Sequence, residues 1–175
     1  YKKKIIIAGN HDNVLAEGRL KLQFGTYLCD SGTEFEGLKI WGSPLTKTFD
    51  EMNPKCKAFT CDTEEELASK FSLIPDDIDI LITHGPPKGI LDWNTNGIPC
   101  GSESLFERSR KLTKLKLFVF GHIHEAYSKI DCQEMEKSLP MLLSDNKPCS
   151  LPIIVNASYV NERYEPVNKP VRVVL

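Results

Sequence analysis

The sequence predicts an α/β fold in which buried strands alternate with short helices and polar loops. Three short apolar runs end at glycine or turn residues: Ile5–Ile7, Ile78–Ile82 and Leu117–Phe120. Runs of this length, rich in β-branched or aromatic residues, are typical of strands buried in a parallel sheet. All four histidines of the chain follow these runs. Because ligands of open α/β sheets bind beyond the carboxyl ends of the strands, one site could collect all four imidazoles.

After the first strand, the sequence predicts a short helix and a pair of strands. Residues 15–24 have the mixed character of a short helix, and strand-like pieces lie at 26–29 and 38–41. Two turn signals lie between these strands: Ser31-Gly32 and Glu36-Gly37.

A long loop and a well-marked helix come next. Residues 42–61 have loop character, and a loop of that length in a compact domain usually carries function or folds over a site. The helix begins after Thr63, because Thr63 can cap it while Glu66 reaches back to the cap backbone. Leu67 and Phe71 are four residues apart and therefore face the core together.

The second half of the chain repeats the alternation of loop, helix and strand. Residues 84–101 are rich in Gly, Pro and Asn and predict a second long loop, and residues 104–112 predict a helix. Further strands are expected near 126–130, 152–156 and 171–175. Residues 131–150 look like a polar insertion, and we expect one domain over residues 1–175.

Composition limits the classes of protein to consider. The chain has 175 residues, 41% hydrophobic and 26% charged, which is ordinary for a globular domain. A net charge of −2 gives no electrostatic reason to expect nucleic acid or a membrane surface as a partner. No apolar stretch approaches the ~20 residues of a membrane helix. The six cysteines form no Cys-x-x-Cys pair, so we expect reduced thiols and a cytoplasmic protein.

The histidine segments carry the residue types of a metal site. They are Gly9-Asn10-His11-Asp12, Thr83-His84-Gly85-Pro86-Pro87 and Gly121-His122-Ile123-His124. Imidazole nitrogens and the asparagine amide oxygen both bind divalent Mn, Fe or Zn, and neighbouring glycines let the backbone come close to the centre. A single histidine is more often a hydrogen-bonded loop residue, but four histidines placed after strands favour a metal site. His122 and His124, two residues apart, could serve two neighbouring ions.

These motifs resemble those of the calcineurin-like metallophosphoesterases. Gly9-Asn10-His11-Asp12, His84 and Gly121-His122-Ile123-His124 are similar to the third to fifth motifs of that family. The animal metallophosphoesterase-domain-containing subgroup shows a similarity that extends to residues 78–87, Asp92-Trp93 and Asn156-Ala157-Ser158. The resemblance implies a sandwich of two β-sheets flanked by helices, with metal-dependent hydrolysis of phosphoesters.

The resemblance also implies a role for each site residue. Asn10, His84 and His122 would hold one metal and His124 a second, with manganese as the expected ion and iron or zinc as alternatives. His11 would lie beside the substrate phosphate and protonate the leaving group as a general acid. The expected substrates are small phosphodiesters or phosphomonoesters, including cyclic nucleotides.

Other side chains could assist, although simpler alternatives exist for each. Arg108 and Arg110 could help to hold phosphate, but they also suit a solvated helix face. Trp93 could stack on a base, but it also suits packing in the core or within its loop.

Two motifs of that family do not occur in this chain. There is no Gly-Asp dipeptide, and no histidine has an aspartate two residues before it. These motifs would supply three of the family's seven ligand residues, including the carboxylate that bridges the two metals. Without it, two closely spaced dications would repel strongly. We therefore expect at most one ion, and little phosphoesterase activity from this polypeptide.

Two explanations account for the absent motifs. The chain could be a piece of a longer enzyme that lacks its first βα region, which suits a sequence that opens on Tyr1 rather than methionine. It could instead be a naturally shortened relative that binds nucleotide or phosphate, or one metal, without turnover. Loss of the first strands would expose a sheet edge, so a shortened protein is expected to self-associate through that edge.

Overall fold

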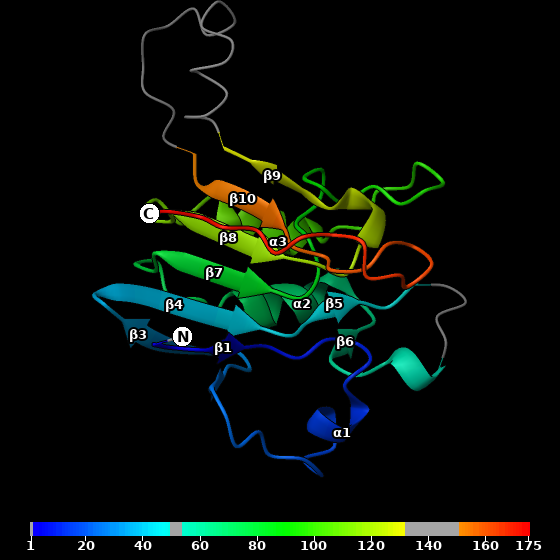
Figure 1. Cartoon of the computed structure of the whole chain (residues 1–175), viewed down its shortest axis with the longest axis horizontal. Coiled ribbons are helices and arrows are strands. Elements are labelled where there is room, and N and C mark those ends of the chain that lie inside the picture. The colour runs from blue at the N-terminus through cyan, green and yellow to red at the C-terminus, as the bar shows by residue number, and fades with distance from the viewer. Residues whose placement is uncertain (1, 50–53, 132–150) are drawn as a thin grey trace, which may run out of the picture.

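The largest sheet of the protein has six strands of mixed direction (Figure 1). The computed structural model describes residues 2–49, 54–131 and 151–175. In sheet order the strands are β3 (Ser31–Phe35), β4 (Leu38–Ser43), β7 (Ile80–Thr83), β8 (Leu117–Phe120), β10 (Ile153–Asn156) and β9 (Ser128–Ile130). The four inner strands are parallel, and β3 and β9 run antiparallel at the edges. The carboxyl ends of the inner strands therefore meet along one side of the sheet.

A second layer packs against this sheet, but it is small. Two parallel pairs accompany the large sheet: β1 (Ile5–Ile6) with β2 (Thr26–Tyr27), and β5 (Thr46–Lys47) with β6 (Thr60–Cys61). A Cβ atom on Gly42 of β4 would lie 2.5 Å from the Leu28 Cβ and 2.8 Å from the Ile7 Cγ2, so the glycine lets the layers meet. The α/β class is confirmed. The expected second sheet is small, because within the described ranges the strands outside the six-stranded sheet form two separate pairs.

Helices cover one face of the large sheet (Figure 1). They are α2 (Glu64–Phe71) and α3 (Glu103–Ser109), with the short α1 (Asn13–Ala16) and the 3₁₀ turns η1 (Pro54–Cys56) and η2 (His124–Ala126) elsewhere. The predicted capping box is present at α2, where Glu66 N donates to Thr63 Oγ1 at 3.2 Å and Thr63 N to Glu66 Oε2 at 3.4 Å. Leu67 and Phe71 are buried in the core, as predicted, with Leu81, Leu105 and Phe118.

Three sequence-based assignments were wrong. A helix was expected over 15–24, but only the four-residue α1 forms there. None of its side chains is buried, so packing against the core does not stabilise a longer helix. Ser31-Gly32 is not a turn but the start of β3, because the hairpin turns at Glu36-Gly37, where both residues have positive φ (51° and 80°). No strand forms over 171–175. The expected insertion at 131–150 falls almost wholly outside the described residues.

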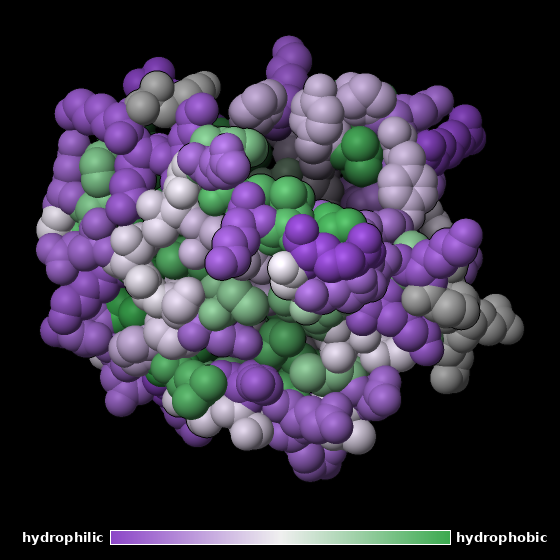
Figure 2. Space-filling view, turned by 90° about the horizontal axis from the view of Figure 1, so that it is seen from below, coloured by the Kyte–Doolittle hydropathy of each residue, from purple (hydrophilic) through white to green (hydrophobic). Residues whose placement is uncertain are grey.

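Some apolar side chains lie open on the face that carries α1. Figure 2 looks onto this side of the molecule and shows apolar patches among polar ones. Val14, Leu20 and Phe24, from this part of the chain, are 40%, 48% and 62% exposed. Self-association through the edge of β1 stays a prediction. No helix in the described residues has the length and apolarity needed to cross a bilayer.

Asp79 joins three inner strands at their amino ends. Its Oδ2 accepts a 2.9 Å hydrogen bond from Lys39 N of β4, and its Oδ1 lies 2.9 Å from Lys116 Nζ. Its backbone carbonyl also accepts from Lys116 N at 2.8 Å, just before β8. The ion pair with Lys116, and then the Lys39 amide, hold the pKa of the Asp79 carboxyl below its usual range. The ionised carboxylate therefore stabilises the junction of β4, β7 and β8.

We expect Asp79→Ala to lower the free energy of unfolding by about 1–3 kcal/mol at pH 7, since the Lys39 amide loses its acceptor. Because the folded-state pKa of Asp79 lies below the unfolded one, its contribution is present above about pH 4 and is lost as the pH falls further. Urea unfolding from pH 7 towards pH 3 should show the two proteins converging. Asp77→Ala is the control, because its pair with Lys39 is solvent-exposed and an exposed ion pair contributes little to stability. Equal losses for both variants would contradict this account.

Candidate metal centre

The centre of the candidate site is a contact between two loops that follow different strands. Asn10 follows β1 and His84 follows β7, and Asn10 Oδ1 lies 2.8 Å from His84 Nε2. Asn10 is only 4% exposed, and its Nδ2 donates to the Cys56 carbonyl at 3.0 Å. The Cys56 carbonyl therefore fixes the amide so that its oxygen faces His84. Cys56 lies in the segment 42–61, which was expected to be a loop but whose described residues include β5, η1 and β6.

Gly9 allows this contact because it has no side chain. A Cβ atom at Gly9 would lie 2.4–2.9 Å from three ring atoms of His84, closer than real Cβ contacts come. The predicted close approach of the backbone is therefore present here. Asp12 holds the turn, because its Oδ2 accepts from Gly9 N at 2.8 Å.

His122 completes a group with Asn10 and His84. The His84 and His122 rings are 4.7 Å apart between centroids, and Gly121 N donates to the His84 carbonyl at 3.1 Å. His122 has a φ of 69°, a left-handed conformation that a side chain adopts only where its surroundings enforce it. Burial, reinforced by neighbouring imidazoles, lowers the pKa of His84 to about 3 and that of His122 to about 4. Both rings are therefore neutral at pH 7, the state in which an imidazole binds a metal.

The other two histidines lie beside this group and are joined through the C-terminal segment. His11 is exposed, with its Nδ1 3.4 Å from Cys56 Sγ. His124 Nδ1 donates a hydrogen bond of 3.1 Å to the Asn161 carbonyl oxygen, which fixes the direction of the ring. The Tyr164 ring packs edge-on against both, with centroids 6.2 Å from His11 and 5.1 Å from His124. All four imidazoles gather at one place, as the sequence predicts.

Asn156, at the end of β10, supports the loop between His122 and His124. It is fully buried, and its Nδ2 donates to the carbonyls of Ile123 at 2.9 Å and Leu91 at 3.2 Å. Its Oδ1 accepts from both the N–H and the Oγ of Ser158. Asn156 thus holds the backbone between the two histidines while every polar atom of its own side chain is paired.

Four residues that contact the candidate ligands or their loops were given no role by the sequence alone: Cys56, Asn156, Asn161 and Tyr164. The length of the 42–61 loop was a signal for Cys56, although it did not select the residue. Asparagine at a strand end was a weak signal for Asn156. Nothing local marked Asn161 or Tyr164, because their contacts with histidines join segments far apart in the chain.

The donor set fits one divalent ion better than two. In the described residues, no three His, Cys, Asp or Glu side chains form a group that could hold a metal. Asn10, His84 and His122 instead offer one amide oxygen and two neutral imidazoles, a combination that suits first-row divalent metals. His11 and His124 are further nitrogen donors beside this group, and among the described residues no carboxylate joins them in such a group.

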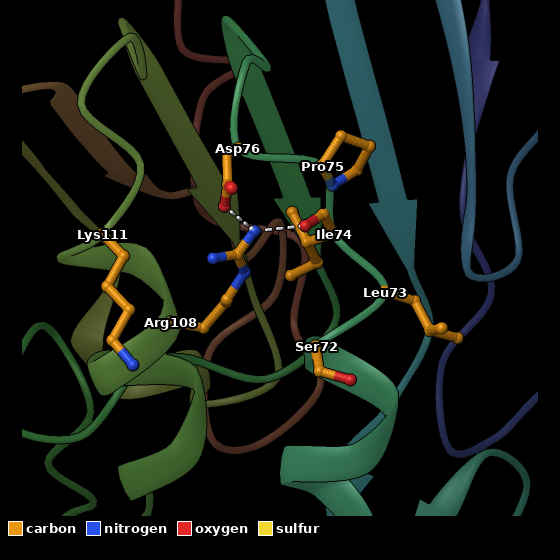
Figure 3. Close-up of a pocket in the computed structure, with 7 residues that line it drawn as sticks. All are labelled: Ser72, Leu73, Ile74, Pro75, Asp76, Arg108 and Lys111. Atoms are coloured by element: carbon orange, nitrogen blue, oxygen red, sulfur yellow. Dashed lines mark hydrogen bonds and ion pairs between the residues drawn. The ribbon is translucent and has the colours of Figure 1, made fainter.

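The arginines considered for phosphate binding face elsewhere. Arg108 donates to the Ile74 carbonyl and pairs with Asp76 at 2.6 Å, in a pocket of about 500 Å³ (Figure 3). Residues 72–76, which line this pocket, come before β7 in the chain, whereas His84 comes after it. The pocket is therefore separate from the histidines. Arg110 pairs with Glu107 and lies over the Phe106 ring. Trp93 is 53% exposed rather than packed in the core.

The fold and the Asn–His group together define an α/β domain of the metallophosphoesterase class. The chain belongs to the calcineurin-like phosphoesterase family, whose model matches residues 1–126. Members of this family typically use divalent metals.

Curated relatives agree with this assignment. Metallophosphoesterase domain-containing protein 1 of Homo sapiens is 31% identical over 199 residues, which cover 98% of this chain and 54% of the relative. The protein of the same name from Mus musculus matches with the same figures. A UPF0046 protein of Caenorhabditis elegans is 33% identical over 150 residues, covering 73% of this chain and 51% of the relative. The chain spans about half the length of these curated relatives.

We expect Gly9→Ala to weaken Mn²⁺ binding at least tenfold, because the new methyl group would overlap the His84 ring and displace it from Asn10. Gly121→Ala is the matched control, since its Cβ would meet Ser158 Oγ at an ordinary 3.5 Å. Isothermal titration with MnCl₂ measures both affinities. Equal affinities in the two variants would show that the Asn10–His84 contact is not part of the metal site.

Proposed function

We propose that this protein is a metal-dependent phosphoesterase that acts on small phosphodiesters or phosphomonoesters, including cyclic nucleotides. The observation that carries the proposal is the 2.8 Å contact of Asn10 Oδ1 with His84 Nε2, beside the His122 ring, in a chain of this family. Two neutral imidazoles and an amide oxygen are donors that could bind a cation and, through it, the anionic phosphate that a cation attracts.

The proposal gives each residue a defined task. Asn10, His84 and His122 would hold the ion, with manganese first and iron or zinc as alternatives. A bound divalent ion neutralises charge on the phosphate and makes water a better nucleophile. His11, exposed beside the group, would protonate the leaving oxygen as general acid, and its Nδ1 contact with Cys56 fixes the direction of the ring. His124 would accept a second ion only with further ligands, so at most one ion is expected here.

We expect one Mn²⁺ per chain, bound weakly because its three protein ligands are all neutral. Electron paramagnetic resonance of free Mn²⁺ during a titration gives the stoichiometry. His84→Ala should abolish this binding, whereas His11→Ala should retain it, since His11 is assigned to the substrate and not to the ion. Two tightly bound ions per chain would refute the single-site assignment.

We expect slow, Mn²⁺-dependent hydrolysis of bis(p-nitrophenyl) phosphate. His84→Ala should remove the dependence on Mn²⁺, which release of p-nitrophenolate measures. Because p-nitrophenolate leaves as an anion, the role of His11 is tested with a cyclic nucleotide, whose alkoxide leaving group must be protonated. His11→Ala should reduce kcat for that substrate by about 100-fold or more without changing the Mn²⁺ affinity, as measured by chromatography of the product.

Two other outcomes of this assay are informative. Activity that is indifferent to both substitutions would place the chemistry elsewhere and overturn the proposal. Thermal stabilisation by nucleotide with no product at all would favour the alternative, a relative that binds phosphate or nucleotide without turnover.

A further inference from the structure

The chain that follows β10 passes beyond the carboxyl ends of the sheet strands (Figure 1). Tyr164 lies edge-on to His124 at 5.1 Å and to His11 at 6.2 Å between ring centroids. The residue is nevertheless 63% exposed. Its ring therefore borders the site while much of its surface remains open to solvent.

A closely hydrogen-bonded turn holds Tyr164 in this position. Asn161 Oδ1 accepts from Arg163 N at 2.9 Å and from Glu165 N at 3.0 Å, and Asn161 Nδ2 donates to Glu165 Oε2 at 2.7 Å. The Asn161 carbonyl accepts from Tyr164 N at 2.9 Å and lies 3.1 Å from His124 Nδ1. The turn that carries the tyrosine is thus attached directly to a site histidine.

Packing alone does not account for this arrangement. Tyr164 has a φ of 61°, a conformation unfavourable for a large side chain unless its surroundings impose it. An exposed ring gains little from burial, and no other described residue lies within hydrogen-bonding distance of its hydroxyl group. Conformations of this kind cluster at ligand-binding sites, where a side chain must be presented in a fixed direction.

We propose that Tyr164 is the surface on which the leaving group of the phosphoester stacks, so that the site selects esters of planar, aromatic or nucleoside alcohols. The inference rests on the proposed function, in which His11 protonates the leaving oxygen. A leaving group bound next to His11 lies on the side of the site that Tyr164 borders. Aromatic rings offset-stack at centroid distances of about 4.5–7 Å, so a planar group on the exposed surface of Tyr164 would lie near His11, whose ring touches Tyr164 edge-on.

The test compares two phosphonates that cannot be hydrolysed, benzylphosphonate and ethylphosphonate, each titrated calorimetrically into the protein with Mn²⁺. In both, a CH₂ group replaces the ester oxygen. The wild-type protein should bind benzylphosphonate about three- to tenfold more tightly, the range expected of one aromatic contact. Tyr164→Ala should abolish that preference, measured as the ratio of the two affinities in the same variant, and Tyr164→Phe should keep it.

Tyr159→Ala is the matched control, because Tyr159 is 60% exposed in the same segment and makes no ring contact with a site histidine among the described residues. It should keep the preference. A second readout needs no substitution: with diamagnetic Zn²⁺ in place of Mn²⁺, nuclear Overhauser effects should join the benzyl protons to the Tyr164 ring in the wild-type protein.

The outcomes separate the inference from the function on which it rests. If ethylphosphonate binds the wild-type protein and benzylphosphonate has no advantage, or keeps its advantage in Tyr164→Ala, the stacking surface is refuted and the proposed function stands. If neither phosphonate binds in the presence of Mn²⁺, the proposed function fails and the inference fails with it.

Discussion

The approach of the Gly9 backbone to the His84 ring is the contact on which the rest of the site depends. It joins the small β1–β2 layer to the large sheet, at the point where β1 and β7 both end. Gly42 has a related role further along the interface, where it lets Leu28 and Ile7 reach β4. The Asn10 amide can meet an imidazole from the other layer only because neither glycine carries a side chain. The geometry of the site is therefore a product of how the layers pack.

The features that sequence predicted well depend on neighbours in the chain. The α2 cap needs only Thr63 and Glu66, and the histidine loops need only the apolar strands before them. The features that it missed depend on distant partners. Ser31-Gly32 has a turn composition, but pairing with β4 draws it into a strand. The size of the second layer likewise depends on pairing between strands, which local periodicity does not report.

The same distinction applies within the site. Strand ends predicted that Asn10, His84 and His122 would converge, and they do, although Asn10 and His84 are 74 residues apart. Asn161 and Tyr164 reach the histidines from a C-terminal segment that has no regular structure, so no periodic pattern could place them. Their contacts with His124 and His11 follow from the path of the chain after β10. The convergence of the candidate ligand residues was thus foreseeable, whereas the side chains that surround them were not.

The burial of Asn156 has a consequence for the chemical modification of the chain. Asn156-Ala157-Ser158 has the sequence of an N-linked glycosylation acceptor. In the folded protein, however, the amide nitrogen that would carry the sugar is enclosed and donates to the carbonyls of Leu91 and Ile123. A glycan attached during synthesis would have to occupy the interior beneath the histidine loop. The folded state and an oligosaccharide at Asn156 are therefore mutually exclusive.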